Sequence, residues 1–93
     1  MNLNQLSNEF NNLLSQTKGI ETKSVQEIIT LARSLYKLAP QLQALSLDHN
    51  HPTMDCGRKC AQAILPVLVD KGRQEGVKTP TELMQLIEIM KNS

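Results

Sequence analysis

The side chains best suited to chemistry gather in thirteen consecutive residues, DHNHPTMDCGRKC, at positions 48–60. This stretch holds both histidines and both cysteines of the chain, with two aspartates beside them. Zinc and iron are held by such groups when several of them converge on one point. The stretch therefore raises the hypothesis of a metal site, for which the candidate ligands are His49, His51, Cys56 and Cys60.

The spacing and the helical phase of these residues favour a plainer interpretation. The pattern H-x-H-x4-C-x3-C matches none of the common zinc spacings. If a helix begins near Pro52, Cys56 and Cys60 lie on its apolar face, where a packed core places small apolar side chains. The histidines then fall in the preceding loop, where Asn50 or His51 could cap the first N–H groups. We therefore predict core cysteines and loop histidines, and a small metal- or redox-responsive protein that binds zinc or iron is the alternative.

Thiol chemistry is the other possibility that this stretch raises. A disulfide between Cys56 and Cys60 would distort the helix, because side chains one turn apart rarely reach the required S–S torsion. Cys–His catalysis would need a thiolate near positive charge, but the helical phase points Arg58 and Lys59 away from the cysteine face. The sequence also lacks a glycine-rich phosphate loop and a pair of carboxylates on an apolar face. We therefore expect a protein that is not an enzyme and needs no cofactor.

The apolar spacing along almost the whole chain is helical, and no stretch alternates apolar and polar residues as a strand would. A chain of 93 residues has room for one small core. The sequence therefore predicts an all-α fold, a single compact helical bundle of about four main helices plus one short connecting helix. We expect residues 1–93 to form a single domain.

Start and stop residues set the first two expected helices. Apolar residues at helical spacing predict the first over residues 3–14, before a stop at Gly19. In the second, Ser24 and Glu27 predict a capping box, with the Ser24 side chain and the Glu27 side chain each bonding the other's backbone N–H. Pro40 predicts a kink, after which the chain restarts as the short connecting helix over residues 40–47.

The other two main helices also carry end residues. The third is expected from Pro52 to about Glu75, because proline suits the first helical position and Gly76 suits the stop. The sequence TPTE predicts the start of the last helix, with Thr79 as the cap, Pro80 first and Glu82 third.

The charges of the chain do not indicate a particular class of partner. Ten Lys and Arg against nine Asp and Glu give a net charge of +1, which provides no global field toward nucleic acid or an acidic membrane. The expected last helix carries Glu82 and Glu88 before its first Lys, the wrong sign for phosphates. A weak nucleic-acid-associated regulator is therefore only the third interpretation, based on scattered basic residues.

The lengths of the apolar segments argue against a membrane-spanning protein. The longest apolar run, Ala63 to Leu65, is far shorter than the ~20 residues that span a bilayer. The start MNLNQLSNEF lacks the basic, apolar and small-residue regions of a signal peptide, which predicts a cytoplasmic protein.

The broad apolar faces of the expected second and last helices are the remaining indication of function. Leu31, Met84 and Ile89 lie at the edges of these faces, and a bundle of this size has little core with which to cover them all. We therefore predict that they form an interaction surface for a protein partner or for self-association, such as a homodimer through the last helix. The alternative is that these residues simply belong to the core. The expected function is that of a small adaptor, regulator or assembly subunit.

Overall fold

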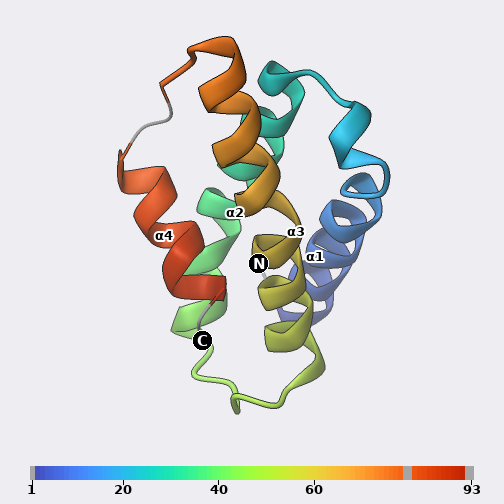
Figure 1. Ribbon diagram of the computed structural model, residues 1–93. Helices are drawn as coiled ribbons and strands as arrows, with labels where there is room; N and C mark the ends of the chain where they lie inside the picture. Colours follow the sequence, from blue (N-terminus) through green and yellow to red (C-terminus); the bar gives the residue numbers. More distant parts are fainter. Residues whose placement is uncertain (1, 79–80, 92–93) are drawn as a thin grey trace.

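The described part of the chain forms four α-helices and one 3-10 turn. The computed structural model describes residues 2–78 and 81–91, apart from the side chains of Glu82 and Lys91, and this part of the chain contains no strand. Its elements are α1 (Leu3–Gln16), η1 (Ile20–Thr22), α2 (Val25–Ala44), α3 (Pro52–Glu75) and α4 (Thr81–Lys91) (Figure 1). The predicted all-α bundle with four main helices is confirmed.

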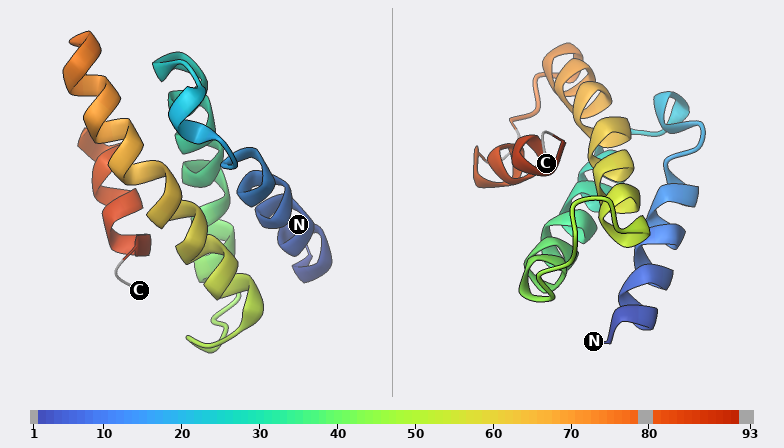
Figure 2. Two further views of the ribbon diagram at one scale, coloured as in Figure 1. Left: turned by 45° about the vertical axis from the view of Figure 1, so that its right-hand side comes forward. Right: turned by 90° about the horizontal axis from the view of Figure 1, so that it is seen from below.

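The longest helix, α3, is the centre of the arrangement. It packs against each of α1, α2 and α4, and α1 and α4 lie on opposite sides of the α2–α3 pair (Figures 1 and 2). At about 1.5 Å per residue its 24 residues span roughly 36 Å. The molecule measures 37 × 23 × 20 Å, so α3 runs nearly its full length.

Apolar side chains from all four helices form one core cluster. With no Trp, one Phe and one Tyr in the chain, this core is mostly aliphatic. The largest fully buried side chains are Phe10, Leu6, Ile28, Leu35, Ile64, Leu68, Ile87 and Cys60. No helix among the described residues is long and apolar enough to cross a membrane.

Gly57 is a point on α3 where side chains of the other three helices lie close to its backbone. A Cβ atom added there would lie 3.2 Å from Cδ2 of Leu42, 3.3 Å from Cε of Met90 and 3.4 Å from Cε1 of Phe10. These side chains belong to α2, α4 and α1. Because glycine has no side chain, all three can pack directly on the α3 backbone.

The helix starts use side-chain caps. At α2 the Ser24 Oγ accepts from the Glu27 N–H at 3.2 Å, as predicted, but the Glu27 carboxylate accepts from the Ser24 hydroxyl at 3.3 Å and not from its backbone N–H. Half of the predicted capping box is therefore present. A complete box stands at α1, where Asn2 and Gln5 each accept from the other's backbone N–H at 2.9 and 3.1 Å.

The predicted break at Pro40 was wrong, because α2 continues through this residue to Ala44. The Pro40 ring lies on the exposed side of the helix, and Ala39 and Leu42 around it are buried in the core. A proline inside a helix removes one hydrogen bond, and the packing of the neighbouring side chains offsets that loss. No separate connecting helix forms over residues 40–47.

The short element lies instead between α1 and α2, where η1 places Ile20 in the core at 5% exposure. Gly19 precedes it with φ of +67°, a left-handed conformation that glycine adopts without strain. The expected stop at Gly19 is thus a turn residue, two residues beyond the Thr17 cap of α1.

The predicted bounds of α3 are confirmed. Pro52 is its first residue and Glu75 its last, and Gly76 follows with φ of +67°. The Val77 N–H donates to the Gly72 carbonyl at 2.9 Å, which closes the helix end with a Schellman motif. The predicted cap at Thr79 and the first position at Pro80 lie outside the described residues, as does the Glu82 side chain.

Candidate functional site

Both cysteines lie on the face of α3 that packs against α1. Cys60 is fully buried and its Sγ donates to the Phe10 carbonyl at 3.6 Å. Cys56 is 8% exposed and its Sγ donates to Oδ1 of Asn11 at 3.6 Å. Both are free cysteines, so the predicted core thiols are present and serve as donors to α1.

The environment of the thiols keeps them protonated. Burial raises the pKa of Cys56, and the hydrogen bond with Cys60 and the charge of Lys59 offset part of this rise. Burial also raises the pKa of Cys60, from 9.0 to about 12, and the neighbouring Cys56 raises it further. The thiolate is the form that attacks substrates and binds metals. At neutral pH both side chains are therefore neutral packing groups.

The two histidines lie at the start of α3. His51 is the N-cap, and its Nδ1 accepts from the Thr53 N–H at 3.1 Å. His49 is exposed, and its carbonyl oxygen accepts from Arg58 at 3.0 Å. The prediction that a loop residue, Asn50 or His51, caps this helix is confirmed for His51.

The predicted ligands are not gathered into a metal site. Among the side chains that the structure describes, no group of three or more His, Cys, Asp or Glu residues is placed to hold a metal ion. His51 uses Nδ1 for capping, and the thiols donate toward α1. Zinc or iron binding by His49, His51, Cys56 and Cys60 stays an alternative hypothesis, which direct metal analysis of the purified protein would test.

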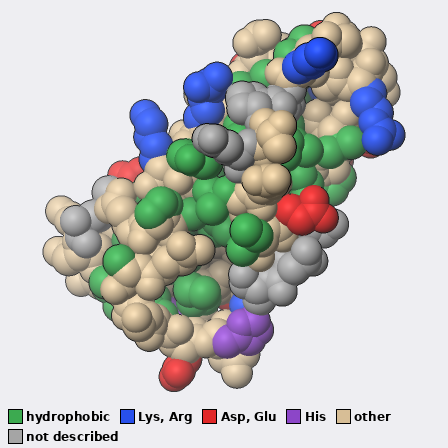
Figure 3. Space-filling model, turned by 90° about the vertical axis from the view of Figure 1, so that its left-hand side faces the viewer, with side chains coloured by type: hydrophobic (Ala, Val, Ile, Leu, Met, Phe, Trp, Pro, Cys, Tyr) green, Lys and Arg blue, Asp and Glu red, His purple; other side chains and the backbone are tan. Residues whose placement is uncertain are grey.

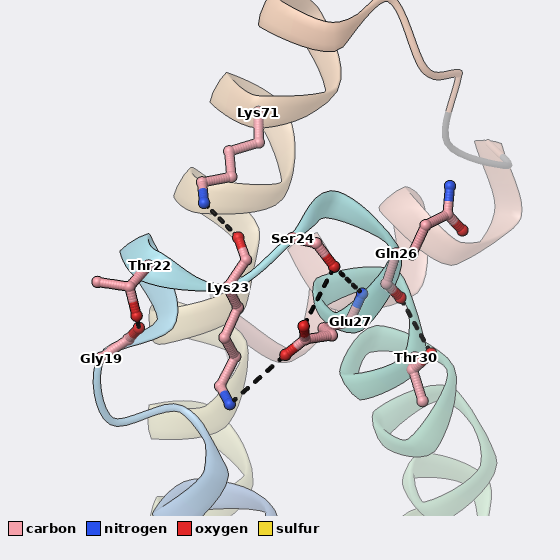
Figure 4. A network of polar contacts seen from close by, with 8 residues as sticks. All are labelled: Gly19, Thr22, Lys23, Ser24, Gln26, Glu27, Thr30 and Lys71. Carbon is pink, nitrogen blue, oxygen red and sulfur yellow. Dashed lines mark hydrogen bonds and ion pairs between the residues drawn. The ribbon is translucent and has the colours of Figure 1, made fainter.

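Several basic side chains make contacts within the chain. Asp55 pairs with Arg58 and with Lys59, each at 3.1 Å. Lys71 of α3 donates to the Lys23 carbonyl just before α2 (Figure 4). Arg58, Lys59 and Lys71 therefore all have partners within the chain.

The three residues of the predicted interaction surface have different surroundings. Leu31 is only 6% exposed and belongs to the core, so it lies outside any surface of this structure. Met84 is half-buried, and Ile89 is 58% exposed. Ile89 follows the fully buried Ile87 by two residues, or about 200° around α4.

Two hollows meet at Met84 on the outer side of the bundle. One lies between α4 and the end of α3, where Val69, Arg73 and Val77 are among the lining residues. The other lies on the outer face of α4 and is lined by Thr81, Met84, Gln85, Glu88 and Ile89. We call the residues lining these two hollows the α4 surface. Figure 3 shows hydrophobic side chains across the face that carries α4.

No protein-family model, curated protein or solved structure matches this chain. The α4 surface therefore has to be interpreted from its own residues.

Tyr36 is a surface residue that sequence reasoning missed, because its helical phase assigned it to the apolar half of α2. It is 41% exposed. Ala39 and Gln43, three and seven residues later on the same side of α2, line a hollow with Met90 of α4. Tyr36 is thus on the α4 side of α2. The residue type carried information, because tyrosine combines an apolar ring with a polar tip and is enriched at interfaces.

Proposed function

We propose that this protein is a small, non-enzymatic binding protein that contacts a protein partner through the α4 surface, as an adaptor, a regulator or an assembly subunit. The observation that carries the proposal is the exposure of Ile89, at 58%, on a helix whose other apolar positions are buried or half-buried. Full burial of such a side chain contributes about 1.5–3 kcal/mol. A partner that covers Ile89 would gain roughly half of that energy, because 58% of this residue is still exposed.

The residues around Ile89 have the composition of an interface. Apolar side chains form the centre of a typical interface and polar ones its rim. Here Met84 and Ile89 are five residues apart, or about 140° around α4, and Thr81, Gln85 and Glu88 lie between them on its outer face. Methionine is flexible and adapts to the shape of a partner. This arrangement supports binding by apolar contacts on both sides of a polar strip.

The proposal assigns no catalytic role to the cysteines and histidines. Both thiols are buried donors with raised pKa values, and His51 caps α3. A cytoplasmic location is part of the proposal and is favoured by the two free cysteines, because oxidising compartments promote disulfides.

Photocrosslinking tests this surface directly. A benzophenone amino acid is placed at Gln85, an exposed residue of the α4 surface, in the cells that naturally make the protein. The matched control carries the same group at Gln26, an exposed residue of α2. We expect a discrete adduct from Gln85 only, reduced at least about tenfold by Ile89→Lys, because a buried lysine would lose its hydration. The same adduct from both positions, or one unaffected by Ile89→Lys, would contradict the proposal.

The Ile89→Lys variant must remain folded for this test. Because the Ile89 side chain is mostly exposed, we expect its replacement to change the unfolding free energy by about 0.5 kcal/mol or less. Ile87→Lys, two residues earlier, should unfold the protein, since Ile87 is fully buried. Urea denaturation of both variants checks that the crosslink reports binding and not folding.

A further inference from the structure

We propose that the partner of the α4 surface is a second copy of this chain, joined by a two-fold contact in which Arg73 of each copy pairs with Glu88 of the other. This inference rests on the proposed function, because it names the occupant of the same surface. It is carried by the placement of two opposite charges around Met84.

Arg73 and Glu88 lie on different sides of Met84. Arg73 lines the hollow between Met84 and the end of α3, and Glu88 lines the hollow between Met84 and Ile89. Both side chains are exposed, and within the part of the chain that the structure describes neither forms an ion pair. Asp55, in contrast, has two cationic partners in its own chain. The α4 surface thus presents one positive and one negative group.

This distribution of charge is complementary to itself. In a two-fold contact, residue i of one copy meets residue j of the other, and j meets i. A rotation axis that passes beside Met84 places Arg73 opposite Glu88 of the second copy and Glu88 opposite Arg73 of the second copy. Two ion pairs then flank an apolar centre formed by Met84 from both copies, and each Ile89 lies on the far side of Glu88 from this centre. A surface with two charges of one sign would repel its own copy.

The other properties of the surface agree with a contact of this kind. The net charge of +1 gives weak repulsion between two copies. A two-fold contact uses the same surface on both chains, so the assembly closes at two copies. The apolar centre is small, which predicts weak association, with a Kd on the order of 10–100 µM.

Sedimentation equilibrium with charge-exchanged variants tests the pairing. The wild-type chain should pass from monomer to dimer between roughly 1 µM and 1 mM. Arg73→Glu and Glu88→Arg should each weaken self-association at least about tenfold, because each leaves two like-charged pairs in the contact. Mixed one to one, the two variants should form a heterodimer, since every Arg then meets a Glu. Arg33→Glu, an exposed residue of α2, is the matched control and should associate as the wild type does.

Three results would overturn the second-copy proposal. They are a wild-type monomer over the whole range, single variants that dimerise as well as the wild type, and a mixture that stays monomeric. The Gln85 crosslink separates this failure from that of the proposed function. An adduct at twice the chain mass supports the second copy, one of another mass overturns it while a binding surface remains, and no adduct overturns both.

Discussion

The Cys60 thiol donates to the carbonyl oxygen of Phe10 across 3.6 Å, between residues fifty positions apart in the chain. One turn earlier, Cys56 donates to Asn11. The two thiols therefore join α3 to α1 at adjacent points. The residue types alone suggested metal ligands. In the structure both thiols are instead buried in the contact between α1 and α3.

Alkaline pH should weaken the fold through Cys60. The unfolded thiol ionises from about pH 9, while the folded one stays neutral until about pH 12, because burial raises its pKa. The unfolded state thus loses its proton first, and stability falls as the pH rises from 9 toward 12. By pH 10.5 this loss should reach about 2 kcal/mol. Urea denaturation at pH 8 and pH 10.5 measures it.

Cys60→Ala gives the comparison, because other groups also titrate in this range. The variant should be less stable at pH 8 by roughly 1–2 kcal/mol, as a small buried group is lost. Its additional loss at pH 10.5 should be smaller than that of the wild type. Equal losses in the two proteins would mean that the Cys60 thiol does not couple folding to pH.

Gly57→Ala should destabilise the bundle. The added methyl group would lie 3.2–3.4 Å from side chains of three other helices, and such overpacking costs about 1–3 kcal/mol. The higher helix propensity of alanine offsets about 1 kcal/mol of this. We expect a net loss of up to about 2 kcal/mol in thermal or urea denaturation.

A double-mutant cycle identifies the cause of that loss. In a Leu42→Ala background, the Cδ2 atom that a new Cβ would meet is absent. Gly57→Ala should then cost less than in the wild type, by at least about 0.5 kcal/mol. Additive effects would show that close packing against Leu42 is not responsible.

Replacing the His51 cap should loosen the start of α3. His51→Ala removes the Nδ1 acceptor of the Thr53 N–H, and loss of an N-cap costs about 0.5–2 kcal/mol. His51→Asn restores an acceptor and should recover most of that stability. His49→Ala is the matched control and should be near neutral, because only the backbone carbonyl of His49 makes a contact that we describe. A similar loss in both alanine variants would rule out the capping role.

Lys71 should stabilise the junction between η1 and α2. It donates to the Lys23 carbonyl, and Lys23 itself pairs with Glu27 at 4.0 Å (Figure 4). Lys71→Met keeps the apolar stem but removes the charged donor, so we expect a loss of roughly 1–2 kcal/mol. Amide exchange in residues 20–24 should accelerate with it.

Lys59→Met is the control for that substitution on the same helix. Lys59 pairs with Asp55 on the surface and is 59% exposed, so its loss should cost less than about 1 kcal/mol. If the two variants lose equal stability and residues 20–24 exchange at the wild-type rate, Lys71 does not hold this junction.

Periodicity and end residues predicted much of the fold. The bounds of α3 followed from Pro52 and Gly76, and the burial of both cysteines followed from their phase. Pro40 was misjudged because its effect depends on the packing of Ala39 and Leu42, which a local rule does not contain. Proline marks a probable end, but core contacts decide whether the helix continues.

The surface was harder to predict than the core. Helical phase placed Leu31 at the edge of the apolar face of α2 and Tyr36 within that face. In the structure Leu31 is buried and Tyr36 is exposed. Which edge of a broad face becomes covered depends on the positions of α1 and α4, and one helix in isolation does not contain that information. The pairing of His51 with Thr53 was within reach, because capping is local.

The central helix of this bundle is third in the order of synthesis. While a ribosome makes the chain, α1 and α2 emerge before α3, and the apolar faces that α3 will cover stay open to water or to a chaperone. Among these four helices α4 emerges after the other three and packs on them. A chain that stops short of α4 therefore cannot present Ile89, and it lacks the surface that we assign to binding.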